Sequence, residues 1–177
     1  MTRIEHGIDR LRVLDLALCT RCNRALRFPS ARRLFAVVSR LGDGVFWYAT
    51  MALILAVRGA AGVRPVLHMI AVGVVCTVGY NWLKASTSRP RPYSVAGAVV
   101  RRGAEPLDAF SFPSGHTLHA VAFSIVAIAY APALAWALVP FTLLVAMSRL
   151  VLGLHYPRDV LAGAAIGALV AALSFGF

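Results

Sequence analysis

Three short segments of the chain hold the residue types that could do chemistry together. The first, Lys84 to Pro92, carries a lysine and two arginines, and the second, Phe112 to His116, ends in a histidine that opens an apolar run. The third, Ser148 to Asp159, carries arginine, histidine and aspartate. Cations hold anionic oxygens, imidazoles attack or transfer protons, and a carboxylate can orient an imidazole. Such a set is typical of a site for phosphoryl transfer.

The cations that we expect to bind phosphate are Lys84, Arg91 and Arg149. Arg149 lies near the end of an otherwise apolar run, where a charge costs a few kcal/mol unless it has a partner or a purpose. Arginine forks match phosphate oxygens in pairs, and lysine acts as a point charge. Arg101 and Arg102 are better explained as side chains that extend to lipid headgroups.

The second segment predicts the start of a helix, because proline, serine and glycine precede an apolar run. The free N–H groups of a first helical turn form an anion site. Ser114 adds a hydroxyl, Gly115 lets the backbone approach closely, and His116 is placed to protonate a leaving oxygen. Taken alone, an ordinary helix cap would explain this segment better.

In the third segment, Pro157 suits the first position of a helix, so that Asp159 falls at the third. A carboxylate there can reach back to the residues before the helix. If it holds one nitrogen of His155, the other nitrogen is free to attack. A capping aspartate beside an interfacial histidine is the simpler alternative when this segment is taken alone.

The elements that must position these residues are apolar and long. The chain is 59% hydrophobic and only 14% charged, against about 25% charged in ordinary soluble domains. Five apolar runs approach the roughly 20 residues that cross a hydrocarbon core, and we place them at 44–57, 65–83, 115–130, 133–152 and 158–177. The first is short and could begin near Leu34. The prediction is an all-α, multi-pass transmembrane helical bundle with five or six spans.

Residues 1–42 differ from the rest, because arginines alternate with apolar residues along them. That density of charge excludes a span and predicts a basic interfacial N-terminal segment, followed by a membrane-embedded domain over residues 43–177. The net charge of +11 carries no basic stripe with interleaved aromatics, so lipid headgroups are expected as partners rather than nucleic acid. The lone pair Cys19 and Cys22 is a weak metal or redox signal.

The order of the runs brings the three segments together. Lys84 ends the second run and His116 begins the third, while Arg149 ends the fourth and His155 and Asp159 begin the fifth. Counting crossings places all of them on one membrane face.

In order and internal spacing, the three segments resemble the signature of the type 2 phosphatidic acid phosphatase superfamily: Lys84-x6-Arg91-Pro92, Pro113-Ser114-Gly115-His116 and Ser148-Arg149-x5-His155-x3-Asp159. The resemblance implies a lipid phosphate phosphatase that works through a phosphohistidine intermediate. It implies His155 as nucleophile oriented by Asp159, His116 as proton donor, and a phosphate site of Lys84, Arg91, Ser114, Gly115 and Arg149. It also implies catalysis with no metal and no cofactor.

The substrate class follows from the resemblance, but its identity stays open. Phosphatidic acid, phosphatidylglycerol phosphate, undecaprenyl diphosphate and a lipid A phosphate share the phosphate that these motifs would bind. Vanadate-dependent haloperoxidases have a similar signature but are soluble, which five apolar runs argue against. A non-catalytic membrane protein that binds or transports anions is the other alternative, and the intact pair of His116 and His155 speaks against it.

We expect the protein in the inner (plasma) membrane. Its N-terminal region should lie on the face of the reactive residues, and it carries Arg3, Arg10, Arg12, Arg21, Arg24, Arg27, Arg32, Arg33 and Arg40, against Arg58 and Arg64 in the opposite loops. Positive residues favour the cytoplasmic side, so this imbalance favours a cytoplasmic active site.

Overall fold

The computed structural model describes the backbone of residues 3–176 and the side chains of residues 10–176. The described residues are mostly helical, with one long loop over residues 96–114, and no strand forms among them. The α-helices run in the order α1 (Arg3–Asn23), α2 (Pro29–Arg40), α3 (Phe46–Arg58), α4 (Val63–Thr87), α5 (Pro92–Val95), α6 (Gly115–Tyr130), α7 (Ala135–Val151) and α8 (Pro157–Leu173).

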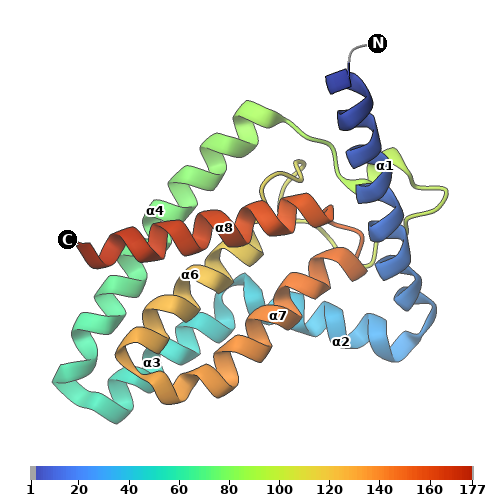
Figure 1. The fold of residues 1–177 in the computed structure, drawn as a ribbon. Helices are drawn as coiled ribbons and strands as arrows, with labels where there is room; N and C mark the ends of the chain where they lie inside the picture. Colours follow the sequence, from blue (N-terminus) through green and yellow to red (C-terminus); the bar gives the residue numbers. More distant parts are fainter. Residues whose placement is uncertain (1–2, 177) are drawn as a thin grey trace.

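Most of these helices are membrane spans by length and composition. Three helical stretches qualify, namely Pro29–Thr87, Pro132–Val151 and Pro157–Gly176, and α6 is shorter but apolar. The first stretch reverses direction at Gly59, which has a positive φ of 55°, so α3 and α4 form a hairpin (Figure 1). Within residues 3–176 this gives five crossings: α2 with α3, α4, α6, α7 and α8. The predicted all-α, multi-pass bundle is confirmed.

The first crossing is longer than the apolar run 44–57 predicted. Its helix begins at Pro29, which takes the first-turn position that suits proline. A wide π-helical turn over Leu41–Val45 then joins α2 to α3. Gly44 has a φ of 139° in this turn, a conformation that side chains rarely tolerate. The boundary predicted between residues 42 and 43 falls inside the turn.

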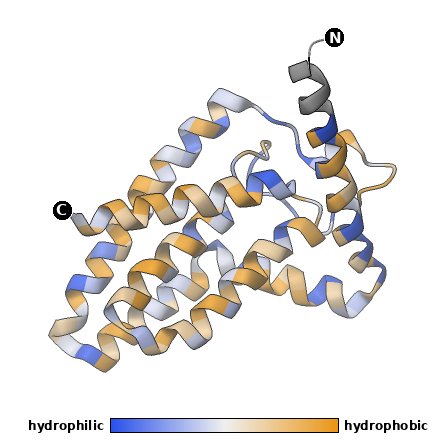
Figure 2. Ribbon diagram, in the orientation of Figure 1, coloured by the Kyte–Doolittle hydropathy of each residue, from blue (hydrophilic) through white to orange (hydrophobic). Residues whose placement is uncertain are grey.

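The outer surface of the bundle is apolar, as a lipid-facing surface must be. Large apolar side chains point outward along the spans, for example Leu67 and Val78 on α4 and Trp136 at the start of α7. Figure 2 shows apolar residues along the long helices and the most hydrophilic ones mainly near their ends and in α1. Soluble proteins rarely expose so much continuous apolar surface.

Helix α6 lies at the centre of the bundle, where it packs against α4, α7 and α8. Glycines on α8 make the closest approach possible. A Cβ at Gly163 would lie 2.5 Å from the Ser114 carbonyl oxygen, and one at Gly167 would lie 2.3 Å from that of Leu118. Small residues allow such contact between membrane helices. This packing aligns the start of α6 with the start of α8.

Helix α1 lies across the ends of α7 and α8 (Figure 1). Asn23 donates to the carbonyl oxygens of Arg101, at 2.8 Å, and Val151, at 2.9 Å. Asp15 is buried and accepts from the Arg158 side chain at 2.6 Å. The N-terminal helix is therefore anchored on the membrane face where Arg149 and His155 emerge.

Candidate active site

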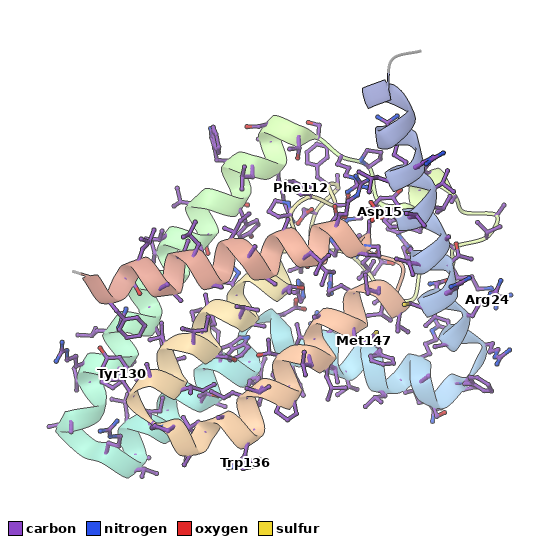
Figure 3. All side chains as sticks on the ribbon, in the orientation of Figure 1. Asp15, Arg24, Phe112, Tyr130, Trp136 and Met147 are labelled. Atoms are coloured by element: carbon purple, nitrogen blue, oxygen red, sulfur yellow. The ribbon has the colours of Figure 1, made fainter. Side chains whose placement is uncertain are left out.

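A cavity of about 530 Å³ opens at this end of the bundle. It is lined by six of the eight residues predicted for the site: Lys84, Arg91, Gly115, His116, Arg149 and His155. In Figure 3, Phe112 and Asp15 mark this end, whereas Tyr130 and Trp136 mark the opposite one. The predicted convergence on one face is what the fold produces.

The other two predicted residues lie behind the cavity wall. The Ser114 hydroxyl is buried and pairs with that of Thr117 at 3.0 Å, and the Ser114 N–H donates to the Asp159 carbonyl oxygen at 3.0 Å. Asp159 is fully buried. Both residues join the start of α6 to the start of α8.

His155 is held between two partners that define its tautomer. The Nδ1–H donates to the Ser111 carbonyl oxygen at 2.5 Å, and Arg91 Nη1 donates to Nε2 at 3.3 Å. A carbonyl only accepts and a guanidinium only donates, so the proton must be on Nδ1 and the lone pair on Nε2. The nitrogen beside the cationic cavity is thus the one that can attack.

The protonation of His155 is set by its surroundings. Its side chain is only 1% exposed. Burial, together with the charges of Arg149 and Arg91, holds the pKa of His155 well below its usual range. The imidazole is therefore neutral at physiological pH.

Asp159 does not make the direct bond to His155 that we expected from the sequence. Its Oδ2 lies 3.9 Å from Nδ1, too far for a hydrogen bond. Instead it accepts from the Tyr156 N–H at 2.9 Å and from Arg89 Nη1 at 2.5 Å. The capping position predicted for Asp159 is correct, and the Ser111 carbonyl takes the place of the expected carboxylate at the imidazole.

Lys84 and Arg91 both pair with a carboxylate from the loop between α5 and α6. Asp108 forms an ion pair with Lys84 Nζ and accepts from Arg91 Nη2 at 2.9 Å. Burial alone would raise the pKa of Asp108, but the two cations outweigh it and lower that pKa. An ionised carboxylate thus bridges the two side chains that we predicted to bind phosphate. Its oxygens stand in for those of a phosphate group.

Arg149 is fully enclosed. Its Nη1 donates to the Ser39 hydroxyl at 2.5 Å. Its Nε is buried and has no hydrogen-bond partner among the side chains and backbone that the structure describes. A buried guanidinium with a free donor at a cavity wall is suited to an incoming anion.

His116 lies in the first turn of α6, against a carboxylate that sequence reasoning missed. Its Nε2 forms an ion pair with Asp43 Oδ1, from the wide turn between α2 and α3. Asp43 directly precedes the apolar run 44–57, and a carboxylate at the edge of a span was a signal of the same kind as Arg149 that could have been used. Asp108 gave no such signal because it lies in a polar loop.

Comparison with known proteins identifies the family. The sequence model described as PAP2 superfamily matches residues 61–177, about two thirds of the chain. The chain belongs to the PAP2 superfamily. The match covers all three PAP2 segments, and the suspected resemblance is confirmed.

Two similar proteins are named as undecaprenyl-diphosphatases. Undecaprenyl-diphosphatase BcrC of Bacillus subtilis is 39% identical over 113 residues, which are 62% of this chain and 55% of that protein. The chain thus aligns with only about half the length of this relative. Undecaprenyl-diphosphatase of Sulfolobus acidocaldarius is 27% identical over 80% of this chain and 68% of its own length.

Two solved structures share the fold. LpxE of Aquifex aeolicus has a TM-score of 0.79 and 27% identity, over 93% of this chain and 96% of its own. The transmembrane PAP2 type phosphatidylglycerolphosphate phosphatase of Bacillus subtilis has a TM-score of 0.74 and 24% identity, over 95% of this chain and 86% of its own. The protein is an integral membrane protein with the PAP2 helical fold.

Proposed function

We propose that the protein is a membrane phosphatase that removes a terminal phosphate from a lipid through a phosphohistidine on His155. The observation that carries the proposal is one continuous cavity with two kinds of wall. Lys84, Arg91 and Arg149 form its cationic end. Its remaining walls are mostly apolar and lie between membrane helices. Such walls suit the hydrocarbon chain of a lipid.

The apolar part of the cavity follows α3 and α4. Trp47 and Met51 line it from α3, and Ile70 and Val74 line it from α4. Ile70 and Lys84 lie 14 residues apart on one helix, which is about 21 Å at 1.5 Å per residue. A lipid whose phosphate meets Lys84 can therefore extend its chain well into the hydrocarbon core.

The chemistry proceeds in two balanced steps. The Nε2 lone pair of His155 attacks phosphorus, the bond to the leaving oxygen breaks, and His116 gives that oxygen its proton. His116, now neutral, then takes a proton from water as the water oxygen attacks phosphorus. The N–P bond breaks, its electron pair returns to Nε2, and inorganic phosphate leaves. Lys84, Arg91 and Arg149 hold the phosphoryl oxygens throughout, and Asp108 must move away when phosphate binds.

Asp159 has an indirect, structural role in this proposal. It holds the His155–Tyr156 backbone at the start of α8, and Arg89 offsets its charge. Ser114 and Gly115 contribute the N-terminal turn of α6, whose N–H groups favour an anion.

A substrate panel tests the proposal. Purified protein in detergent should release inorganic phosphate from at least one of four lipids: phosphatidic acid, phosphatidylglycerol phosphate, undecaprenyl diphosphate or a lipid A phosphate. Undecaprenyl diphosphate comes first, because two relatives carry that activity in their names. Release should continue in a chelator, because the three cations supply the charge that a metal would otherwise supply.

The Val74→Trp variant tests the apolar part of the cavity separately, since Val74 is exposed on α4 and lines the cavity. It should weaken turnover of a long-chain phosphate about tenfold or more and spare a short-chain analogue with the same headgroup. Val75→Trp, exposed on the same helix but outside the cavity lining, is the matched control. Binding without phosphate release from any of the four lipids would favour the alternative, an anion-binding or transport protein.

The site faces the cytoplasm in this proposal, on the inner membrane. The arginine-rich helix α1 is the interfacial segment on the same face, where Asp15 contacts Arg158 and Asn23 contacts Arg101. The loops at the opposite ends of the spans carry only Arg58 and Arg64.

Thiol labelling of intact cells measures this orientation. In a background that lacks Cys19, Cys22 and Cys76, a cysteine replacing the exposed Ala98 should resist a membrane-impermeant reagent. A cysteine replacing the exposed Ala60, in the opposite loop, should react. The reverse pattern would place the site on the outer face.

A further inference from the structure

We propose that Asp43 is a positioning residue that favours the protonated form of His116 and orients it as the proton donor. This inference rests on the proposed function, but it assigns a residue outside the three PAP2 segments. Asp43 Oδ1 forms an ion pair with His116 Nε2, and the two side chains are 22% and 10% exposed. The contact joins the α2–α3 turn to the first turn of α6.

The two glycines that flank Asp43 in the wide turn place its carboxylate against His116. Gly42 lies close to the adjacent helices: a Cβ there would meet Val145 at 3.2 Å and His116 Cδ2 at 3.8 Å. Gly44 takes up the φ of 139° that ends the turn. Close approach on one side of Asp43 and an unusual backbone on the other deliver the carboxylate to the imidazole.

The charges around His116 explain why a carboxylate is needed there. Arg149 from α7 and Lys84 from α4 line the same cavity as His116, so two positive charges face a protonated imidazole there. His155, from the α7–α8 connection, is neutral, and His119 on α6 itself contacts Thr77 and the Gly115 carbonyl oxygen. Asp43 is the negative group in contact with His116 among the described side chains.

A general acid must hold its proton until the leaving oxygen needs it. In this cavity, cations that serve phosphate binding work against that requirement. Asp43 opposes their effect through its ion pair with Nε2, which leaves Nδ1 as the nitrogen for the leaving oxygen. Asp43 thus acts through His116 and does not itself touch substrate.

Asp43→Asn is the test, because it keeps the size of the side chain and removes its charge. On a lipid phosphate, which has a poor leaving group, turnover at neutral pH should fall about tenfold or more, and the high-pH limb of the rate profile should move down by about one pH unit or more. On p-nitrophenyl phosphate, whose leaving group needs no proton, the loss should be several-fold smaller. Asp43→Glu, which restores the charge, should bring back the position of the high-pH limb.

The controls separate this inference from the proposed function. Glu105→Gln removes an exposed carboxylate paired with Arg102 and should leave both rates and the profile unchanged. Equal losses on both substrates with an unmoved high-pH limb would mean that Asp43 is merely structural and would overturn the inference. So would wild-type behaviour of Asp43→Asn. If the wild-type protein released no phosphate from any substrate, the proposed function would fail and the inference with it.

Discussion

The His155→Ala variant is expected to be folded, inserted in the membrane and inactive. We expect turnover of the best lipid substrate to fall by about 10⁴-fold or more, as happens when a covalent nucleophile is removed. The structure gives the reason. The unprotonated Nε2 of His155 faces the cationic end of the cavity, because the Ser111 carbonyl oxygen holds the imidazole proton on Nδ1. Phosphate release under steady-state conditions measures the loss.

His68→Gln is the matched control, since it removes an imidazole at the far end of the bundle. His68 pairs there with Tyr130 and Ser174, away from the cavity. This variant should keep most of the activity. If His155→Ala retained near-wild-type turnover while remaining folded, another residue would have to be the nucleophile.

The pKa of His155 also determines how activity should change as the pH falls below neutrality. Because that pKa lies well below its usual range, His155 stays neutral as the pH falls through 6.5. Activity should therefore persist on the acid side of neutrality and decline only where His155 begins to take up a proton.

The second large effect is expected for His116→Ala, and its size should depend on the leaving group. General acid catalysis contributes about 10²–10⁴-fold, so a loss of that order is expected on lipid phosphates. On p-nitrophenyl phosphate the first step needs no proton, and phosphorylation of His155 should remain fast. Burst kinetics on the two substrates separate that step from the second.

Equal damage to the phosphorylation step on both substrates would argue against a proton-donating role for His116. A selective loss on poor leaving groups, with a residual slow second step, is the expected pattern. The second step slows on either substrate because the same imidazole must then take a proton from water.

The sequence was sufficient to predict the helical class and the convergence of the site, for a physical reason. Spans must be about 20 residues long, so the number of crossings between Lys84, His116, Arg149 and His155 decides which face each residue reaches. The start of the first span was harder to predict. Arginines in α2 lower its hydropathy, although the helix continues from Pro29 through the wide turn.

The details of the site depend on contacts that spacing does not encode. Ser111 reaches His155 through a backbone carbonyl, to which any residue type could contribute. Asp108 reaches Lys84 through the fold of a long polar loop. Asp43 and His116 meet where Gly42 lets the α2–α3 turn approach Val145 on α7 and His116 on α6. The spacing predicts that Asp159 orients His155, but its two oxygens accept from the Tyr156 N–H and from Arg89 instead.

Direct detection of the phosphoenzyme tests the central claim most directly. The His116→Ala variant, mixed with p-nitrophenyl phosphate and quenched in alkali within the first turnover, should accumulate the intermediate because its hydrolysis is slowed. Mass spectrometry should find one phosphoryl group on the peptide that contains His155, attached to Nε2, stable in alkali and lost in acid. No label should appear when His155→Ala is added to the same background. A phosphoryl group on any other residue, or phosphate released in a burst with no labelled protein, would contradict the mechanism proposed for this site.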